Sequence, residues 1–372
     1  MNFKIAVLPG DGIGPEVTEQ AIKCLKVVGD TFEHNFTFEE APVGAVAIDK
    51  TGDPLPEATL ELCKNSDAVL FGAIGDPKYD NDPSARVRPE QGLLKLRKEL
   101  GLFTNIRPIK AYTSLIDRSP LRPDRIKNTD MTIYRELTGG IYFGEKKLNE
   151  EGTLASDLCE YSEKEIERIA HQAFKAARTR KNKVTLVDKA NVLETSRLWR
   201  KVVTKVGESY PEVELDFLFV DNAAMQMILN PSQFDVILTE NMFGDIISDE
   251  GSVIGGSIGL LASASVGDKH GLFEPVHGSF PQGKGQNIAN PVASILSAVM
   301  LLEYLGLNEE AHALDCAVTI AIEREIVTED LKPGSRFGTK EVGDHIASLL
   351  ADEGDKICFD PENIEYGKST II

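Results

Sequence analysis

The stretch FKIAVLPGDGIGPE, residues 3–16, indicates the fold class of this chain. Phe3 to Leu8 is an apolar run of strand type, a turn rich in Pro and Gly follows, and a helix-like pattern runs from Glu16 to Val28. The glycines stand at positions 10, 12 and 14, whereas a Rossmann dinucleotide fingerprint places its third glycine one residue later. We therefore predict a tight strand-to-helix turn whose backbone approaches a ligand, without a Rossmann fingerprint. A phosphate loop is the weaker interpretation.

Strand-like and helix-like patterns alternate along the rest of the chain. Further strands are expected at 67–71, 131–135, 184–187, 213–220 and 234–239, and a further helix at 91–100. The clearest helix is Glu163 to Arg180, which carries one apolar stripe and begins with a capping box of Ser162 and Glu165. This alternation is typical of an α/β architecture. Because the chain is too long for one core and has no Ser/Gly linker, we expect two interleaved lobes.

The composition is that of an acidic globular protein. The 372 residues include 40 Lys and Arg against 59 Asp and Glu, a formal net charge of −19, which argues against nucleic acid and anionic membranes as partners. No apolar run is long enough to span a membrane, and Met1 to Gly14 resembles neither a signal nor a transit peptide, so we expect a cytoplasmic protein. Five widely spaced cysteines without a C-x-x-C pair predict reduced thiols and no zinc site.

The helix expected at 91–100 has a mixed apolar and basic face. Glu90, Leu93, Leu94 and Arg97 follow at i, i+3, i+4 and i+7 and share one side of the helix. The core stripe of this helix is predicted to consist of Leu93, Leu96 and Leu100. Leu94 then lies beside Arg97 and off the core stripe, although a solvated arginine with an incidental leucine is an alternative.

Two further arginines, Arg107 and Arg135, stand beside predicted strands. Guanidinium groups make bidentate contacts to carboxylates. If Arg97, Arg107 and Arg135 meet in one cleft of this acidic chain, they form a positive site suited to a dicarboxylic acid. Spacing alone does not decide whether they meet.

Carboxylates follow in the second half of the chain. Asp245 and Asp249 are i and i+4 on an expected helix, so they project from one face, and Asp221 after the apolar run 217–220 is a plausible third member. An all-oxygen set of this kind suits Mg²⁺ or Mn²⁺. Surface acids of an acidic protein are the alternative.

Lys189, Tyr142 and one long loop complete the candidates. Lys189 follows the strand 184–187, at the strand end where open α/β sheets bind ligands, and a lysine there can serve as a base or proton relay. Tyr142 lies in a Gly-rich segment. The loop from Glu274 to Pro291 has no obvious secondary structure, and its His277 and Asn290 can offer hydrogen bonds to a purine and a ribose. A surface lysine, a core-edge tyrosine and a shape-giving loop are the respective alternatives.

Together these segments resemble the metal-dependent β-decarboxylating dehydrogenases. The resemblance runs from about residue 3 to residue 350 and rests on four motifs in the family's order: LPGDGIGPE at 8–16, RELTGGIYFG at 135–144, VDKANVLE at 187–194 and ENMFGDIISD at 240–249. It implies an α/β fold of the isopropylmalate/isocitrate dehydrogenase type, with two interleaved lobes around a central cleft. The first lobe, 1–103 plus 258–372, would hold the chain termini and the nucleotide-binding loop. The second, 104–257, would hold the dimer interface and the metal-binding carboxylates.

The resemblance also implies roles for single residues. Arg97, Arg107 and Arg135 would hold the two carboxylates of a malate core. Asp245 and Asp249, with Asp221 from the second subunit of a homodimer, would bind Mg²⁺ or Mn²⁺ and, through it, the substrate. Lys189 from that subunit would act as base or relay while hydride passes from C2 to NAD, and Tyr142 would protonate the enolate carbon after CO₂ is lost.

Substrate and cofactor choice follow from two further segments. The isopropylmalate-using members carry Glu-x-Gly-Leu-Leu before the first arginine, which here reads Glu90-Gln91-Gly92-Leu93-Leu94, and Val192 of the second subunit would complete this apolar seat. These members act in leucine biosynthesis, and two leucines cannot accommodate the third carboxylate of isocitrate. NAD would be bound by Ile13, Glu274, His277, Gly278, Gln282 and Asn290.

Gln282 departs from the family pattern, because many NAD-using members have Asp there. Gln282 can still bind a ribose hydroxyl, and no Lys-Tyr pair of the NADP-using kind follows it, so NAD is favoured. Two other functions remain open: the same chemistry on tartrate, D-malate or homoisocitrate, and a non-catalytic regulatory subunit. The second predicts gaps among the catalytic and metal-binding residues, and none is missing.

Overall fold

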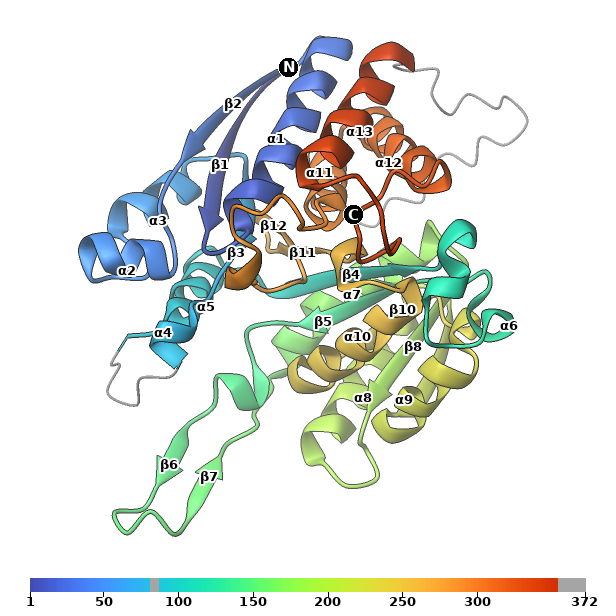
Figure 1. The fold of residues 1–372 in the computed structure, drawn as a ribbon. Helices are drawn as coiled ribbons and strands as arrows, with labels where there is room; N and C mark the ends of the chain where they lie inside the picture. The colour runs from blue at the N-terminus through green and yellow to red at the C-terminus, as the bar shows by residue number, and fades with distance from the viewer. Residues whose placement is uncertain (81–86, 354–372) are drawn as a thin grey trace. The chain divides into compact units, whose positions relative to one another are not determined.

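A computed structural model describes residues 1–80 and 87–353, which divide into two compact units. Of the described residues, those of Met1–Leu102 and 256–353 form unit 1, and Phe103–Gly255 form unit 2. Unit 2 is therefore one continuous stretch inserted into unit 1 (Figure 1). The functions that the resemblance assigns to the two lobes stay predictions.

The strands of unit 1 form a largely parallel sheet. Their order is β2 (Asn35–Glu40), β1 (Asn2–Gly10), β3 (Ala68–Ala73), β12 (Gly271–Pro275) and β11 (Ala262–Val266). β1 is parallel to β2 and β3, β3 is parallel to β12, and β11 is antiparallel to β12. The predicted strand from Phe3 to Leu8 lies inside β1, so the turn that follows it opens at the carboxyl edge of this sheet.

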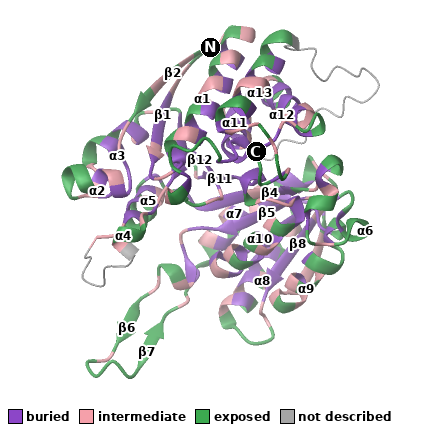
Figure 2. Ribbon diagram, viewed as in Figure 1, coloured by how far each residue is buried: buried purple, intermediate pink, exposed green. Residues whose placement is uncertain are grey.

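Helices complete unit 1. They are α1 (Gly14–Thr31), α2 (Ala45–Thr51), α3 (Glu57–Lys64), α4 (Pro77–Asp80), α5 (Pro89–Glu99), α11 (Val292–Tyr304), α12 (Asn308–Glu323) and α13 (Thr339–Glu353), with 3-10 turns at Ile258–Leu260 and Pro281–Gly283. Leu96 and Leu100 are buried in a core with residues of β1, β3 and α3, and Leu93 packs against its edge. Leu94 is 43% exposed, so the predicted separation of Leu94 from the core stripe is correct. The strand β12 is buried along its length (Figure 2).

The strands of unit 2 are also mostly parallel. They lie in the order β4 (Thr104–Lys110), β5 (Asp130–Glu136), β10 (Val236–Thr239), β8 (Lys183–Asp188) and β9 (Glu214–Phe219). β4 is antiparallel to β5, and the other neighbours are parallel. The strand expected to reach residue 220 ends at Phe219, because α9 begins at Val220 and places Asp221 in its first turn.

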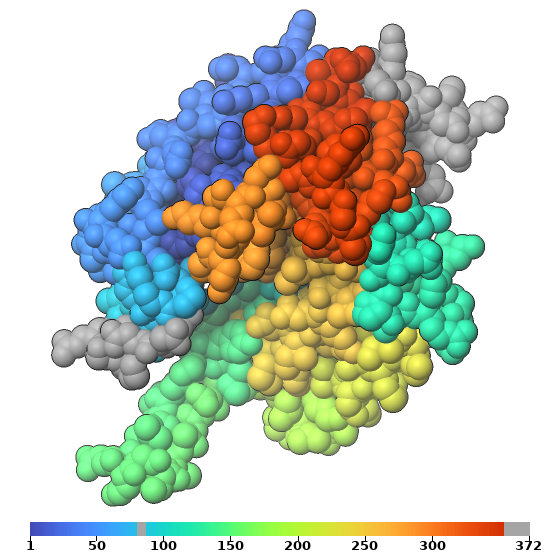
Figure 3. All heavy atoms as spheres, viewed as in Figure 1, coloured from blue at the N-terminus to red at the C-terminus, as the bar shows by residue number. Residues whose placement is uncertain are grey.

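The remaining elements of unit 2 are helices and one hairpin. The helices are α6 (Pro123–Ile126), α7 (Glu163–Arg178), α8 (Glu194–Gly207), α9 (Val220–Leu229) and α10 (Asn241–Gly255), with 3-10 turns at Thr113–Arg118, Gly140–Tyr142 and Pro231–Gln233. The predicted capping box of α7 is present, because Glu165 N–H donates to Ser162 Oγ at 3.3 Å and Ser162 N–H to Glu165 Oε2 at 2.7 Å. The hairpin of β6 (Lys146–Leu148) and β7 (Ala155–Asp157) projects from this unit (Figure 3).

A buried ion cluster ties the starts of β5 and β10 to the end of α7. Arg180 donates to Asp130 at 2.6 Å and to Asp235 at 2.9 Å, and its side chain is 4% exposed. Asp235 also accepts the backbone N–H of Lys181 and Lys183. The cluster lies at the amino ends of the parallel strands, opposite the edge that carries the candidate site, and has a structural role.

Two expectations from the composition are tested by the structure. Cys24, Cys63 and Cys159 are free thiols, but Cys316 is disulfide-bonded, so the prediction that all cysteines are reduced is wrong at that position. Within residues 1–80 and 87–353, none of the helices combines the length and the apolar character that crossing a membrane requires.

Candidate functional site

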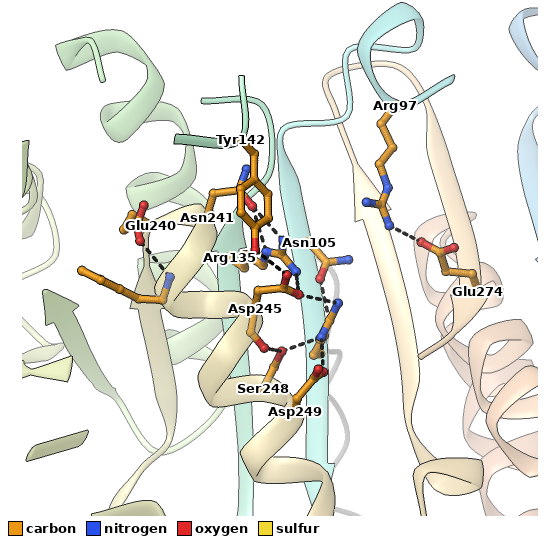
Figure 4. A network of polar contacts seen from close by, with 12 residues as sticks. Arg97, Asn105, Arg135, Tyr142, Glu240, Asn241, Asp245, Ser248, Asp249 and Glu274 are labelled. Atoms are coloured by element: carbon orange, nitrogen blue, oxygen red, sulfur yellow. Dashed lines mark hydrogen bonds and ion pairs between the residues drawn. The ribbon is translucent and has the colours of Figure 1, made fainter. Parts of the chain in front are cut away.

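One face of α10 carries the candidate carboxylates. Asn241, Gly244, Asp245, Ser248 and Asp249 follow at helical spacing and face β4 and β5 (Figure 4). The helix starts directly after β10, where the buried carboxylate of Glu240 accepts the N–H of Phe243 at 2.7 Å and so acts as an N-terminal cap. The tight β10–α10 connection fixes this polar face at the carboxyl edge of the sheet.

Arg135 lies at the end of β5 and is 4% exposed. Its Nε and Nη2 donate to Oδ1 of Asn241 at 3.0 and 2.8 Å, and its Nη1 donates to Oδ1 of Asp245. Gly244 makes this position possible, because a Cβ at residue 244 would lie 2.6 Å from Cγ of Arg135. The arginine is therefore held along the surface of α10.

Arg107 comes from the neighbouring strand β4 and reaches the same face of α10. Its Nε donates to Asn105 Oδ1 at 2.9 Å, and its Nη1 donates to Ser248 Oγ at 2.5 Å and to Asp249 Oδ1 at 3.2 Å. Its Nη2 lies 3.7 Å from Asp245 Oδ1. The structure thus brings together four predicted site residues of unit 2: Arg107, Arg135, Asp245 and Asp249.

Tyr142 adjoins this group. Its hydroxyl donates to Oδ2 of Asp245 at 2.8 Å, and the Arg135 guanidinium carbon lies 5.7 Å from its ring centroid. Burial, followed by the hydrogen bond to Asp245 and the negative charge of that carboxylate, raises the pKa of Tyr142 to about 12. Burial also raises the pKa of Asp245, but Arg135, Tyr142 and Arg107 together hold it below its ordinary value. Tyr142 is therefore protonated, and Asp245 ionised, near neutral pH.

A buried layer beneath the site shapes its backbone. Glu136 accepts the N–H of Thr138 and of Gly139 and pairs with Arg168 at 3.1 Å, so it holds the turn that leads to Tyr142. Tyr161 fills the space beside the glycines of that turn and donates its hydroxyl to Glu240 at 3.0 Å. Burial raises the pKa of both glutamates.

Lys189 and Asp221 pair with each other on the surface of unit 2. Lys189 follows β8, its ammonium donates to Oδ1 of Asp221, and the Asp221 side chain is 67% exposed. This hydrogen bond lowers the pKa of Asp221. Val192 nearby in sequence is 62% exposed. Within the described part of one chain, no three metal-binding side chains converge, so Asp221 does not join Asp245 and Asp249 there.

Arg97 belongs to unit 1. It projects from α5 and donates from Nη2 to Oε1 of Glu274 on β12 at 2.7 Å, while its buried Nε has no partner (Figure 4). Leu94 is exposed one turn before it, and Glu90 is exposed at the start of the helix, with its carboxylate beside Gly75. Arg97 thus offers an unused donor next to an exposed apolar side chain.

The expected nucleotide-binding residues lie in two loops of unit 1 that touch each other. Ile13 N–H donates to Ser279 O at 2.8 Å, and a Cβ at Gly12, whose φ is +59°, would collide with the same carbonyl. The turn after β1 therefore packs against the loop after β12. Ile13 itself is 4% exposed.

The other expected nucleotide-binding residues of the loop after β12 differ in their hydrogen-bond partners and in their exposure. His277 contacts Gly278 O through Nδ1 at 2.9 Å, its buried Nε2 has no partner, and burial lowers its pKa. A Cβ at Gly278 would meet open space, and Gln282 is exposed. Asn290 is already used by the fold, because it donates to Asp330 and caps Val292 N–H, each at 3.0 Å.

Sequence reasoning missed the neutral members of the site, Asn105, Asn241 and Ser248. Each one contacts an arginine, yet none has a charge that draws attention in a sequence. The spacing of 241, 245 and 248 on one helix is the signal that identifies two of them, once Asp245 has been chosen.

Comparison with known proteins decides the family. A profile of the family described as isocitrate/isopropylmalate dehydrogenase matches residues 4–346. The chain belongs to this family. Among curated members, the 3-isopropylmalate dehydrogenase of Bacteroides fragilis (strain YCH46) is 53% identical over 352 residues, covering 94% of this chain and 99% of the relative. That of Aquifex aeolicus (strain VF5) is 51% identical over 355 residues, covering 94% and 97%.

Solved structures of the isocitrate/isopropylmalate dehydrogenase family confirm the predicted α/β fold. An isocitrate dehydrogenase from Methylococcus capsulatus superposes with a TM-score of 0.84 at 33% identity, covering 94% of this chain and 99% of that one. A β-decarboxylating dehydrogenase from Thermococcus kodakarensis, in its apo form, gives 0.76 at 36% identity, covering 94% and 98%.

Proposed function

We propose that this chain is the enzyme of leucine biosynthesis that oxidises and decarboxylates 3-isopropylmalate, with NAD as the hydride acceptor. The products are 2-ketoisocaproate and CO₂. The observation that carries this proposal is the identity of 51–53% to curated 3-isopropylmalate dehydrogenases over 94% of the chain, against 33% to the isocitrate dehydrogenase of known structure. Both comparisons cover nearly the whole chain.

The apolar and basic residues support this substrate. Leu94 is exposed one turn from Arg97 and can receive an isopropyl group, whereas a third carboxylate placed there would lose its hydration without a partner. Arg107 and Arg135 converge on one helix face and supply the charge for the malate carboxylates. In the structure their charge is balanced by Asp245 and Asp249.

The donor set of α10 fits a divalent cation. Asp245 and Asp249 project from one face with the Ser248 hydroxyl between them, and hard oxygen donors of this kind suit Mg²⁺ or Mn²⁺. When bound, the cation lowers the pKa of the substrate hydroxyl and stabilises the negative charge that forms on decarboxylation. The low pKa of Asp245 keeps it ionised and ready to coordinate.

The protein side chains move the protons. Lys189, as base or proton relay, would take the proton of the C2 hydroxyl when C2 is oxidised, and NAD, when bound, would supply the hydride acceptor. The C–C bond to the β-carboxylate then breaks, and its electron pair forms the enolate. Tyr142, whose pKa of about 12 keeps its proton in place, donates that proton to the enolate carbon. Proton release and uptake are thus assigned to two different residues.

NAD is proposed to lie along the two contacting loops of unit 1, near Ile13, His277, Gly278 and Gln282. The unpartnered Nε2 of His277 supports this, because a buried ring nitrogen without a partner is available to a ligand. Gln282 can donate to a ribose hydroxyl. Asn290 is proposed to shape this loop, since its amide is engaged by Asp330 and Val292.

A second copy of the chain is proposed to complete each site with Lys189, Val192 and Asp221. All three lie on the surface of unit 2 rather than beside Asp245. Exposed apolar side chains on α9 of the same unit, Met225 at 54% and Ile228 at 46%, supply the kind of surface that subunits bury. The proposal is a homodimer with two shared sites.

Steady-state kinetics test the function directly. The purified protein is assayed by NADH absorbance with 3-isopropylmalate, D-malate, tartrate, homoisocitrate and isocitrate, each with NAD or NADP and with Mg²⁺, Mn²⁺ or EDTA. We expect the highest kcat/KM for 3-isopropylmalate with NAD, and no turnover with EDTA. A higher kcat/KM for another diacid overturns the substrate, and absence of turnover with all of them indicates a non-catalytic protein.

A further inference from the structure

Asn241, the first residue of α10, is 1% exposed and contacts two other parts of the site. Its Oδ1 accepts hydrogen bonds from both Nε and Nη2 of Arg135 (Figure 4). Its Nδ2 donates to Gly139 O at 3.2 Å, in the turn before Tyr142. We propose that Asn241 is a positioning residue for substrate binding, which fixes the Arg135 guanidinium so that its Nη1 side is presented to a carboxylate of the substrate. This inference rests on the proposed function.

The chemistry of the neighbours allows only one orientation of the Asn241 amide. A guanidinium has donors and no acceptor, so Oδ1 must face Arg135. The carbonyl of Gly139 has no donor, so Nδ2 must face the turn. One amide therefore links the strand that carries Arg135, the turn that leads to Tyr142 and the helix that carries Asp245.

The neutrality of Asn241 is the second part of the argument. Two hydrogen bonds from one amide oxygen hold the guanidinium but leave its positive charge in place. A carboxylate at position 241 would accept the same two hydrogen bonds and would also offset that charge. The Nη1 side contacts Asp245, whose negative charge a bound cation would offset. The charge of Arg135 is then available to the substrate.

The backbone of Asn241 is held as firmly as its side chain. Its N–H donates to the Tyr161 hydroxyl at 3.0 Å, and that hydroxyl donates to the buried Glu240. Gly244, one turn along, leaves room for the stem of Arg135. Arg135 is thus placed before the substrate arrives, which lowers the entropy lost on binding.

The test compares Asn241→Ala and Asn241→Asp with a matched control, Thr239→Val. Thr239 is buried two residues earlier and is the cross-strand neighbour of Arg135. Its hydroxyl donates to Val187 O at 2.9 Å, so its replacement by valine keeps the shape next to Arg135 and removes a buried hydrogen bond that involves no arginine. The readouts are the Kd of 3-isopropylmalate with Mg²⁺ and no NAD, measured by calorimetry, the KM values for 3-isopropylmalate and NAD, and the melting temperature.

We expect Asn241→Ala to raise both the Kd and the KM for 3-isopropylmalate by about ten- to a hundredfold, with the KM for NAD unchanged. Asn241→Asp, which has nearly the same shape, is expected to weaken substrate binding at least as much, because it offsets the charge of Arg135. Thr239→Val is expected to lower the melting temperature and leave both substrate constants within twofold of the wild type.

Three outcomes overturn the inference. The first is Asn241→Ala with substrate constants equal to those of Thr239→Val. The second is Asn241→Asp with wild-type or tighter binding, which also decides the matter if the alanine variant does not fold. The third is a wild type that binds none of the diacids. A wild type that prefers another 2-hydroxy diacid refutes only the proposed substrate, and the variants are then compared with that acid.

Discussion

Replacing Gly244 by alanine tests how closely Arg135 is seated against α10. A Cβ at this position would lie 2.6 Å from Cγ and 2.8 Å from Cβ of Arg135, and 3.0 Å from Cγ2 of Thr239. Overpacking of this kind costs about 1–3 kcal/mol, and replacing Gly by Ala inside a helix returns about 1 kcal/mol. We therefore expect the free energy of unfolding to fall by roughly 0–2 kcal/mol, together with a displacement of Arg135.

The displacement should appear in substrate binding. We expect the KM for 3-isopropylmalate to rise about tenfold, equivalent to about 1.4 kcal/mol, with the KM for NAD unchanged. Urea unfolding and steady-state kinetics measure the two effects. Gly251→Ala, in the same helix, is the control. A Cβ at residue 251 would meet Ile109 and Met227 but no arginine. If both variants leave the substrate KM unchanged, Arg135 is not held by close packing at Gly244.

Three further predictions address other parts of the protein. Lys189→Ala should lower kcat about 10²–10⁴-fold with the dimer intact by light scattering, and full turnover would remove Lys189 from the mechanism. Leu94→Ser should lower kcat/KM for 3-isopropylmalate about tenfold but not for D-malate, which has no isopropyl group to bury; equal losses for both acids would contradict the apolar seat. Burial raises the pKa of Asp130, but Arg180 brings it below the ordinary 3.8. Its folded-state pKa is lowered, so it stabilises the fold above about pH 4 and this contribution is lost as the pH falls further. Urea unfolding between about pH 3 and 6 should show a weaker acid dependence in Asp130→Asn, and an unchanged dependence would refute the assignment.

Features that depend on local spacing were predictable from the sequence. The capping box of α7, the buried stripe of α5 and the shared face of Asp245 and Asp249 follow from helix periodicity, which needs no knowledge of the tertiary structure. The end of β9 at Phe219 was not predictable, because a strand and the helix that follows it can share one apolar run.

The spacing of residues along the sequence could not predict which acidic side chain pairs with which arginine. Arg107 meets Asp249 because α10 packs across both β4 and β5, and Arg97 meets Glu274 across 177 residues of sequence. The neutral contacts of Asn241 depend on the same arrangement. Tertiary placement therefore determines which acid balances which arginine before a ligand binds.

The insertion of unit 2 into unit 1 also constrains the order in which the chain is made and folded. Val69 of β3 pairs with its neighbour Leu272 of β12 only after every residue from 103 to 255 has left the ribosome. Unit 2 is one uninterrupted stretch and can fold during synthesis. Until β12 has been made, β3 has an unpaired edge. We therefore expect the amino-terminal strands of the nascent chain to need protection from aggregation until β12 has been made.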